Sequence, residues 1–143
     1  ALERRLNATY VLKEDRLKQS DFVVLQVPYS PETHHMIGAR ELKLMKPTAI
    51  LINSTRGGVV DDTALIAALR SGVIRAAGLD VFENEPRLNP GFLRLDNVVL
   101  MPHIGSSTEA TRRAMAMTAA RNLVAALTGG KPPNQLNPEA KKT

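Results

Sequence analysis

The stretch AILINSTRGGVVDD, residues 49–62, contains in order a strand, a loop and the start of a helix. Its apolar run Ala49–Ile52 is bounded by proline before it and by small residues after it, which is typical of a buried strand in a parallel sheet. The pair Asp61–Asp62 offers an N-cap to the helical run TALIAALRSG. Open α/β sheets bind ligands beyond the carboxyl ends of their strands, so Arg56 in this loop is a first candidate functional residue.

Three more apolar runs predict strands at Phe22–Val27, Ala76–Val81 and Asn97–Met101. Counted with the strand that begins at residue 49, the strand starts are 27, 27 and 21 residues apart. Helical patterns at Ala39–Met45 and Asp62–Arg70 occupy the first two intervals, and the third is predicted to hold a long loop with one helical turn. Strands that alternate with helices in this way indicate βαβ units, so the sequence predicts an α/β fold with a parallel sheet.

Both ends of the chain depart from this alternation. Near the start, NATYVL (residues 7–12) suggests a short strand and EDRLKQS (residues 14–20) a helix of one to two turns. The last helix is predicted to begin at residue 106 or 107, where the letters SSTE fit a capping box. Residues 114–127 are apolar on nearly all sides of that helix, so we expect it to pack on the sheet and on a second surface as well.

Composition limits the classes of function. The chain has 143 residues, a net charge of +5, no cysteine and five aromatic side chains. Its basic residues are scattered or paired and few aromatics can stack on bases, so a solvated basic surface is favoured over a nucleic-acid-binding face. No apolar run approaches the ~20 residues of a membrane span. The lack of cysteine suits a reducing compartment, and we expect a cytoplasmic protein without membrane or nucleic-acid partners.

Polar side chains follow all four predicted strands. They are Pro28–Thr33, Ser54–Arg56, Asp80 with Glu85, and His103. The carboxyl ends of parallel strands share one rim of the sheet, so these residues are expected to meet although they are distant in sequence. Each residue alone also has a structural interpretation. Arg56 fits an ordinary surface arginine and Asp80 a turn cap, while Glu85 fits a solvated loop residue and His103 a structural histidine. Together they offer an Arg fork for a carboxylate and a His–carboxylate pair suited to proton transfer near neutral pH.

Other kinds of site find less support. His34 and His35 are adjacent, so they do not present the i, i+4 arrangement of a helical metal pair, and we interpret them as surface or interface residues. The sequence has no GxSxG nucleophile motif, no GxxxxGK[ST] loop and no GxGxxG, and no metal site is predicted.

Four segments of this chain resemble, in order, segments of the D-2-hydroxyacid dehydrogenase family. They are SDFVVLQVPYSPETHHMIG, LMKPTAILINSTRGGVVDDTALIAALRSG, AAGLDVFENEP and MPHIGSST, and the resemblance extends from about Asn7 to Glu139. Within the family the chain is most similar to glyoxylate, hydroxypyruvate and 2-ketogluconate reductases, the tail PPNQLNPE included. The resemblance implies the second half of a Rossmann-like doubly wound parallel sheet, followed by a long C-terminal helix.

The resemblance also implies roles for individual residues. Arg56 would bind the carboxylate and carbonyl of the substrate, His103 would exchange the proton, and Glu85 would pair with His103. Asp80 would contact the nicotinamide carboxamide. The implied cofactor is NADP or NAD, with NADPH favoured by the subgroup. The implied cofactor-binding residues are Val27, Pro28, Thr33, Ser54, Thr55, Arg56, Asp80, His103, Gly105 and Ser106.

The chain departs from the family at its start. Without GxGxxG, the residues that would bind the pyrophosphate and the ribose are missing, and so is the substrate domain. We therefore expect residues 1–106 to be the C-terminal half of the NAD(P)-binding domain. Residues 107–143 would form the long helix and tail that return to the absent substrate domain.

The implied function is that of an oxidoreductase. It would transfer a hydride between NAD(P)H and a 2-oxo acid or D-2-hydroxy acid of the glyoxylate, hydroxypyruvate or 2-ketogluconate type. This chain is expected to be an inactive fragment by itself, and the complete enzyme a homodimer. The alternative is a dinucleotide-sensing regulatory or corepressor-type protein on the same fold.

Overall fold

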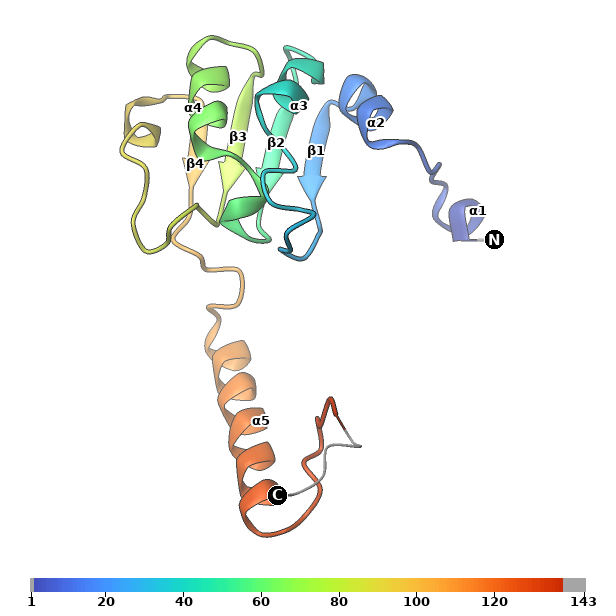
Figure 1. Ribbon diagram of the computed structural model, residues 1–143, viewed down its shortest axis with the longest axis vertical. Coiled ribbons are helices and arrows are strands. Elements are labelled where there is room, and N and C mark those ends of the chain that lie inside the picture. The colour runs from blue at the N-terminus through green and yellow to red at the C-terminus, as the bar shows by residue number, and fades with distance from the viewer. Residues whose placement is uncertain (1, 138–143) are drawn as a thin grey trace. The chain divides into compact units, whose positions relative to one another are not determined.

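The computed structural model describes residues 2–137 and contains one parallel sheet of four strands in the order β1-β2-β3-β4 (Figure 1). Phe22 lies opposite Ile50, and Ile50 opposite Ala76, so the strands are in register at their amino ends. The predicted α/β fold with a parallel sheet is confirmed; β1, β3 and β4 are shorter than their apolar runs, and β2 begins and ends one residue later than its run. The strands are β1 (Phe22–Leu25), β2 (Ile50–Asn53), β3 (Ala76–Leu79) and β4 (Val98–Leu100).

The helices between the strands also follow the sequence pattern. Helix α3 spans Ala39–Leu44 and α4 spans Asp62–Arg70, and the third connection contains one short 3₁₀ helix, η2 (Phe92–Arg94). Another 3₁₀ helix, η1 (Gly57–Val59), precedes α4. The carboxylate of Asp61 accepts a hydrogen bond from the Ala64 N–H at 2.9 Å, so the predicted N-cap of α4 is confirmed.

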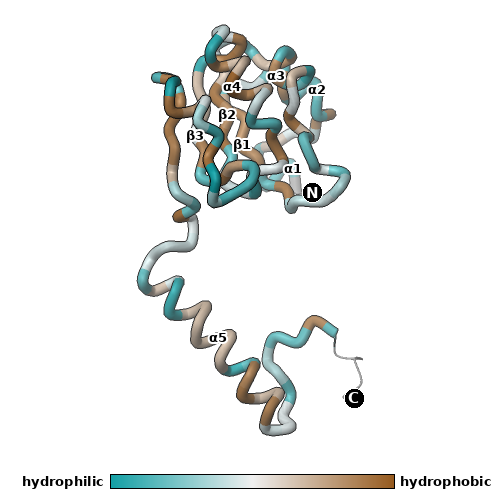
Figure 2. Tube along the Cα trace, turned by 60° about the vertical axis from the view of Figure 1, so that its left-hand side comes forward, coloured by the Kyte–Doolittle hydropathy of each residue, from teal (hydrophilic) through white to brown (hydrophobic). Residues whose placement is uncertain are grey.

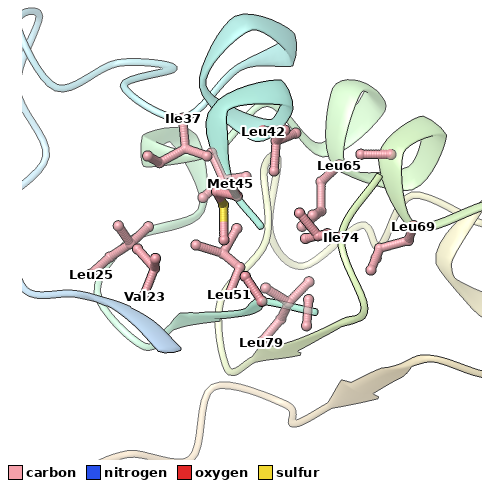
Figure 3. Packing of buried hydrophobic residues seen from close by; sticks show 14 of the residues in the cluster. Val23, Leu25, Ile37, Leu42, Met45, Leu51, Leu65, Leu69, Ile74 and Leu79 are labelled. Atoms are coloured by element: carbon pink, nitrogen blue, oxygen red, sulfur yellow. The ribbon is translucent and has the colours of Figure 1, made fainter. Parts of the chain in front are cut away.

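Helices α3 and α4 pack on one face of the sheet because each consecutive right-handed crossover leaves its helix on the same side. Leu42 and Leu65 point from these helices toward Leu51 and Leu79 of the central strands (Figure 3). All four side chains are buried. Fully burying one such leucine contributes about 1.5–3 kcal/mol to stability.

The opposite face of the sheet carries exposed apolar side chains. Phe22, Val24 and Val99 point to that side and are 64%, 51% and 65% exposed. Strands β1 and β2 are correspondingly brown, meaning hydrophobic, in Figure 2. An apolar face of this kind is typical of a surface that another element or subunit buries.

The start of the chain differs from the prediction. Helix α1 spans Leu2–Leu6 and α2 spans Lys13–Gln19, but residues 7–12 do not form the short strand that was predicted from NATYVL. The reason is local hydrogen bonding: the N–H of Ala8 donates to the carbonyl of Glu3, and the N–H of Tyr10 donates to the Glu3 carboxylate at 2.6 Å. These bonds satisfy backbone groups that a strand would pair with a neighbour.

The last helix, α5, spans Glu109–Leu127. The predicted capping box at residues 106–107 is wrong, because Thr108 is the N-cap and its hydroxyl accepts a hydrogen bond from the Thr111 N–H at 3.2 Å. None of the α5 residues is buried, and its packing on the sheet stays a prediction. In the described part of the chain no helix is both long and apolar enough to cross a membrane.

The chain divides into two compact units, Ala1–His103 and Ile104–Thr143. The first contains the sheet and its helices, and the second contains α5 and the segments on either side of it. The functional boundary predicted after residue 106 stays a prediction.

Candidate active site

A cavity of about 800 Å³ opens where the loops after β1, β2 and β3 meet. Five of the predicted site residues line it, namely Val27, Pro28, Thr55, Arg56 and Glu85. The other lining residues are Tyr29, His34, Gly57, Gly58, Phe82, Glu83 and Asn84. Three loops at the rim of the sheet therefore meet, because the carboxyl ends of parallel strands lie at the same edge.

The loop that carries Arg56 is shaped by Asn53, the last residue of β2. The buried Asn53 amide donates to the Arg56 carbonyl at 3.0 Å. Its carbonyl oxygen accepts from the N–H and the hydroxyl of Thr55 at 3.1 and 2.9 Å. All described hydrogen-bond partners of the Asn53 side chain thus lie within the next three residues, so Asn53 holds the backbone that carries Arg56. Asn53 was not among the predicted site residues.

The Arg56 guanidinium itself is exposed. Its Nη1 donates to the Thr55 carbonyl at 2.6 Å. Among residues 2–137, no carboxylate forms an ion pair with Arg56. Most of the planar donor fork is therefore available to an incoming carboxylate.

The Arg56 loop touches the loop after β3 at Gly57. A Cβ atom on Gly57 would lie 1.9 Å from the carbonyl carbon of Phe82, which no side chain permits. Glycine is thus required here by the close approach of two backbones, not by an unusual φ. This contact sets the separation between Arg56 and the segment that carries Glu85.

Glu85 and His103 form a hydrogen-bonded pair, with Oε2 and Nδ1 2.7 Å apart. The other Glu85 oxygen accepts from the Phe82 N–H at 2.8 Å. Desolvation opposes the charged form of Glu85, but the hydrogen bonds from His103 and Phe82 outweigh it and hold the pKa of Glu85 below its ordinary value.

An ionised Glu85 can only accept a hydrogen bond, so the proton between the two groups belongs to His103 Nδ1. The other ring nitrogen, Nε2, is left to exchange a proton with a bound molecule. His103 has a φ of +54°, a conformation that is uncommon outside glycine and that recurs at functional sites.

A second, mostly apolar groove of about 450 Å³ lies beside this pair. Glu85 lines both cavities, whereas Arg56 lines only the first and His103 only the second. Glu85 therefore shares a cavity lining with each of the other two residues, whereas Arg56 and His103 line different ones of these two cavities. The groove is lined by Phe82, Glu85, Pro86, Leu88, Leu93, Leu100, Met101, Pro102 and His103.

The remaining predicted residues have other surroundings. Thr33 accepts from the Ser30 N–H and donates to the Pro28 carbonyl, both at 2.8 Å, so it stabilises its own loop. Ser54 is exposed. Asp80 is partly buried at the end of β3, where its charge acts against ionisation of Glu85. Gly105 and Ser106 belong to the second unit and are not placed relative to this rim.

Sequence reasoning missed a second cluster of ionisable groups at the rim. His35 Nε2 lies 2.6 Å from the carboxylate of Glu83, and Glu83 is bonded in turn to Asp62. The interpretation of the histidine pair as surface residues fits His34, which is exposed, but His35 is half-buried and bonded. No periodic pattern links residues 35, 62 and 83, so only the folded loops reveal this cluster.

Asp62 is 4% exposed, and its burial raises the pKa of its carboxyl to about 6 from 3.8. The native state then binds a proton that the unfolded chain releases, so this group lowers the free energy of unfolding as pH rises from about 4 to 6. We expect Asp62→Asn to remove this loss of stability. A rise in pKa from 3.8 to about 6 corresponds to at most about 3 kcal/mol in the free energy of unfolding. Asparagine keeps an oxygen that accepts from the Glu83 N–H.

Urea denaturation of the full-length protein at pH 4.5 and pH 7.5 measures this effect. The difference in stability between the Asp62→Asn variant and the parent should be larger at the higher pH. Asp96→Asn, at an exposed aspartate, is the matched control. An identical pH dependence in parent and variant would contradict the raised pKa.

Comparison with known proteins places this geometry in context. The family model described as "D-isomer specific 2-hydroxyacid dehydrogenase, NAD binding domain" matches residues 2–105. A glyoxylate reductase of Thermococcus litoralis is 56% identical over 135 residues, which are 94% of this chain and 41% of that protein. A glyoxylate/hydroxypyruvate reductase B of Enterobacter agglomerans is 52% identical over 96% of this chain and 43% of its own length.

Solved structures agree with these relatives. A glyoxylate reductase from Paecilomyes thermophila superposes with a TM-score of 0.84 at 38% identity, over 99% of this chain and 43% of that one. An NADPH-dependent glyoxylate/hydroxypyruvate reductase from Sinorhizobium meliloti, in complex with NADP and malonate, gives 0.80 at 37% identity, over 85% and 38%. The chain thus spans about two fifths of the length of the proteins it matches.

Proposed function

The chain belongs to the D-isomer specific 2-hydroxyacid dehydrogenase family, and on this premise we propose that it serves the reversible reduction of a 2-oxo acid by NAD(P)H. The observation that carries the proposal is the Glu85–His103 hydrogen bond at 2.7 Å, next to a cavity lined by Arg56. A carboxylate-oriented imidazole is a proton donor, and an arginine fork binds a carboxylate. A 2-oxo acid presents both a carboxylate and a carbonyl oxygen that must gain a proton.

Arg56, His103 and Glu85 then have different roles in the reaction. Arg56 binds the substrate carboxylate and draws electron density from the neighbouring carbonyl. His103 donates the Nε2 proton to the carbonyl oxygen during reduction and takes it back during oxidation. Glu85 keeps the ring in the orientation that points Nε2 away from the carboxylate, and its charge stabilises the imidazolium.

The residues at the rim fit the nicotinamide end of a dinucleotide. The cavity of about 800 Å³ is within the usual size range of small-molecule sites, and Val27 and Pro28 contribute apolar surface to it. Thr55 adds polar atoms to the same lining, and Asp80, whose charge acts on Glu85, is assigned to the nicotinamide carboxamide. When bound, the nicotinamide supplies the hydride. The phosphates would need residues that this sequence does not contain, because it has no GxGxxG.

We propose glyoxylate, hydroxypyruvate or 2-ketogluconate as substrates and NADPH in preference to NADH. The similarity to glyoxylate and hydroxypyruvate reductases supports the first two acids, and the Sinorhizobium meliloti protein is an NADPH-dependent reductase. We further propose a cytoplasmic homodimer. The sequence has no cysteine, which suits a reducing compartment, and Phe22 and Val24 are apolar surface that a second subunit can bury.

Oxidation of NADPH and NADH by the full-length protein, followed by absorbance with each of the three acids, tests this function. We expect saturable oxidation that depends on the acid and is faster with NADPH. Titration of the dinucleotide by fluorescence is the companion measurement. Tight dinucleotide binding without oxidation by any acid would contradict the enzyme and favour the sensing or corepressor-type protein instead.

A further inference from the structure

Three side chains outside the proposed catalytic set form a cluster that we call the Glu83 clamp: His35, Asp62 and Glu83. The two oxygens of Glu83 have different partners. Oε1 lies 2.6 Å from His35 Nε2, and Oε2 accepts from the backbone N–H of Asp62 at 3.0 Å. The backbone N–H of Glu83 returns a bond to the Asp62 carboxylate at 3.1 Å. The clamp therefore consists of three hydrogen bonds around one glutamate.

The bond to Asp62 satisfies a backbone group that helix α4 cannot satisfy. The first N–H groups of a helix have no partner within it, and Asp62 is the first residue of α4. Glu83, in a loop 21 residues further along the chain, accepts the hydrogen bond from that N–H. The reciprocal bond makes a closed ring of two hydrogen bonds between the helix start and the loop after β3. Such a ring restrains both the position and the orientation of the loop after β3 relative to the start of α4.

The bond to His35 adds the loop after β1. His35 has a φ of +48°, and its own N–H donates to the Gly58 carbonyl at 2.8 Å. His35 thus contacts the Arg56 loop through its backbone and the Glu83 loop through its ring. The clamp and the Gly57 contact together join the three loops that line the cavity.

In the chain, Glu83 of the clamp lies next to Glu85, one member of the proposed catalytic pair. Glu83 is two residues before Glu85, and between them Asn84 has a φ of +59°. The Phe82 N–H, on the other side of Glu83, donates to Glu85. A change in the position of Glu83 would therefore move both the backbone of Glu85 and one of its two hydrogen-bond donors.

We propose that Glu83 is a positioning residue: held by His35 and Asp62, it orients the segment 82–85 so that Glu85 meets His103 at the edge of the Arg56 cavity. Glu83 does not touch His103 and acts through Glu85. The kinetic part of this inference rests on the proposed function. Its structural part, the dependence of the Glu85–His103 bond on Glu83, stands on the observed contacts alone.

The kinetic test compares Glu83→Ala with Glu83→Gln in the full-length enzyme. Loss of both clamp bonds that the side chain makes should lower kcat on the order of 10–10²-fold, because small misplacements of catalytic groups have effects of this size. The KM for NADPH should change less than about twofold. Glutamine keeps one acceptor oxygen and should recover part of kcat. Glu14→Ala, at a half-exposed ion-pair residue in α2, is the matched control.

A double variant separates positioning from a general loss of structure. If Glu83 acts through Glu85, adding Glu83→Ala to Glu85→Gln should lower kcat by no more than about twofold beyond Glu85→Gln alone. Losses that multiply would overturn the proposal. If Glu83→Ala does not fold, His35→Gln in the same two backgrounds gives the same comparison.

A titration that needs no turnover completes the test. In the cofactor-free protein, the pKa of the Glu85 carboxyl, followed by carbon NMR, should rise toward 4.5 in the Glu83→Ala variant because the His103 and Phe82 bonds weaken. An unchanged Glu85 pKa would overturn the clamp. If the Glu85 pKa differs between the parent and the Glu83→Ala variant as expected, but the parent shows no activity, the proposed function is overturned and the clamp stands.

Discussion

Replacing His103 with alanine is expected to lower kcat for 2-oxo acid reduction on the order of 10²–10⁴-fold, the usual size of general acid catalysis. The physical reason is the loss of the only imidazole that is hydrogen-bonded to Glu85 in the described chain. The Kd for NADPH should stay within about threefold, because His103 lies beside the apolar groove and not in the cavity lined by Val27 and Pro28. Stopped-flow reduction and fluorescence titration measure the two quantities.

Added imidazole provides the control for this variant. The His103 side chain is 47% exposed, so a small base can reach the space that the alanine leaves. We expect imidazole to restore part of the rate in the alanine variant and to leave the parent unchanged. A variant that turns over at the parent rate without imidazole would remove His103 from the mechanism.

Replacing Arg56 with alanine is the second large effect that we expect. The guanidinium has no ion pair to a carboxylate among residues 2–137, and its charge-assisted bonds to a substrate carboxylate are worth about 1.5–3 kcal/mol. Loss of that interaction, and of the polarised carbonyl, should lower kcat/KM on the order of 10²-fold. Arg56→Lys should recover only part of it, because lysine lacks the planar fork.

Steady-state kinetics with glyoxylate and hydroxypyruvate measure this loss. Arg70→Ala, an exposed arginine in the last turn of α4, is the matched control and should keep the parent kcat/KM. Equal values for Arg56→Ala and Arg70→Ala would contradict the assignment of Arg56 to the substrate carboxylate.

Much of the fold could be predicted because it depends on local patterns. The apolar runs around Val23, Leu51 and Ala77 became neighbouring parallel strands, and Asp61 capped the helix that follows the second of them. Burial and capping act on residues that are close in sequence, so the sequence displays them directly. The same logic failed at NATYVL, where the Glu3 carboxylate and carbonyl bind the backbone instead.

The candidate site was predictable to a smaller extent. Its location on the rim follows from strand direction, and resemblance to a family pointed to Arg56, Glu85 and His103. Asn53 and Glu83 were missed because their partners are decided by how loops fold back, and a hydrogen bond between loops leaves no periodic trace in the sequence. The two-cavity arrangement, with Glu85 lining both, is likewise visible only in three dimensions.

The sequence by itself thus determined the alternation of strands and helices, the direction of the strands and the edge at which the polar residues gather, since each depends on burial patterns within a few residues. Only the tertiary structure decided which of those residues touch. The contacts of Gly57 with Phe82, of Glu83 with Asp62 and of Glu85 with His103 each join segments far apart in the chain. They depend on loop conformations, positive φ values among them, that side-chain polarity does not encode.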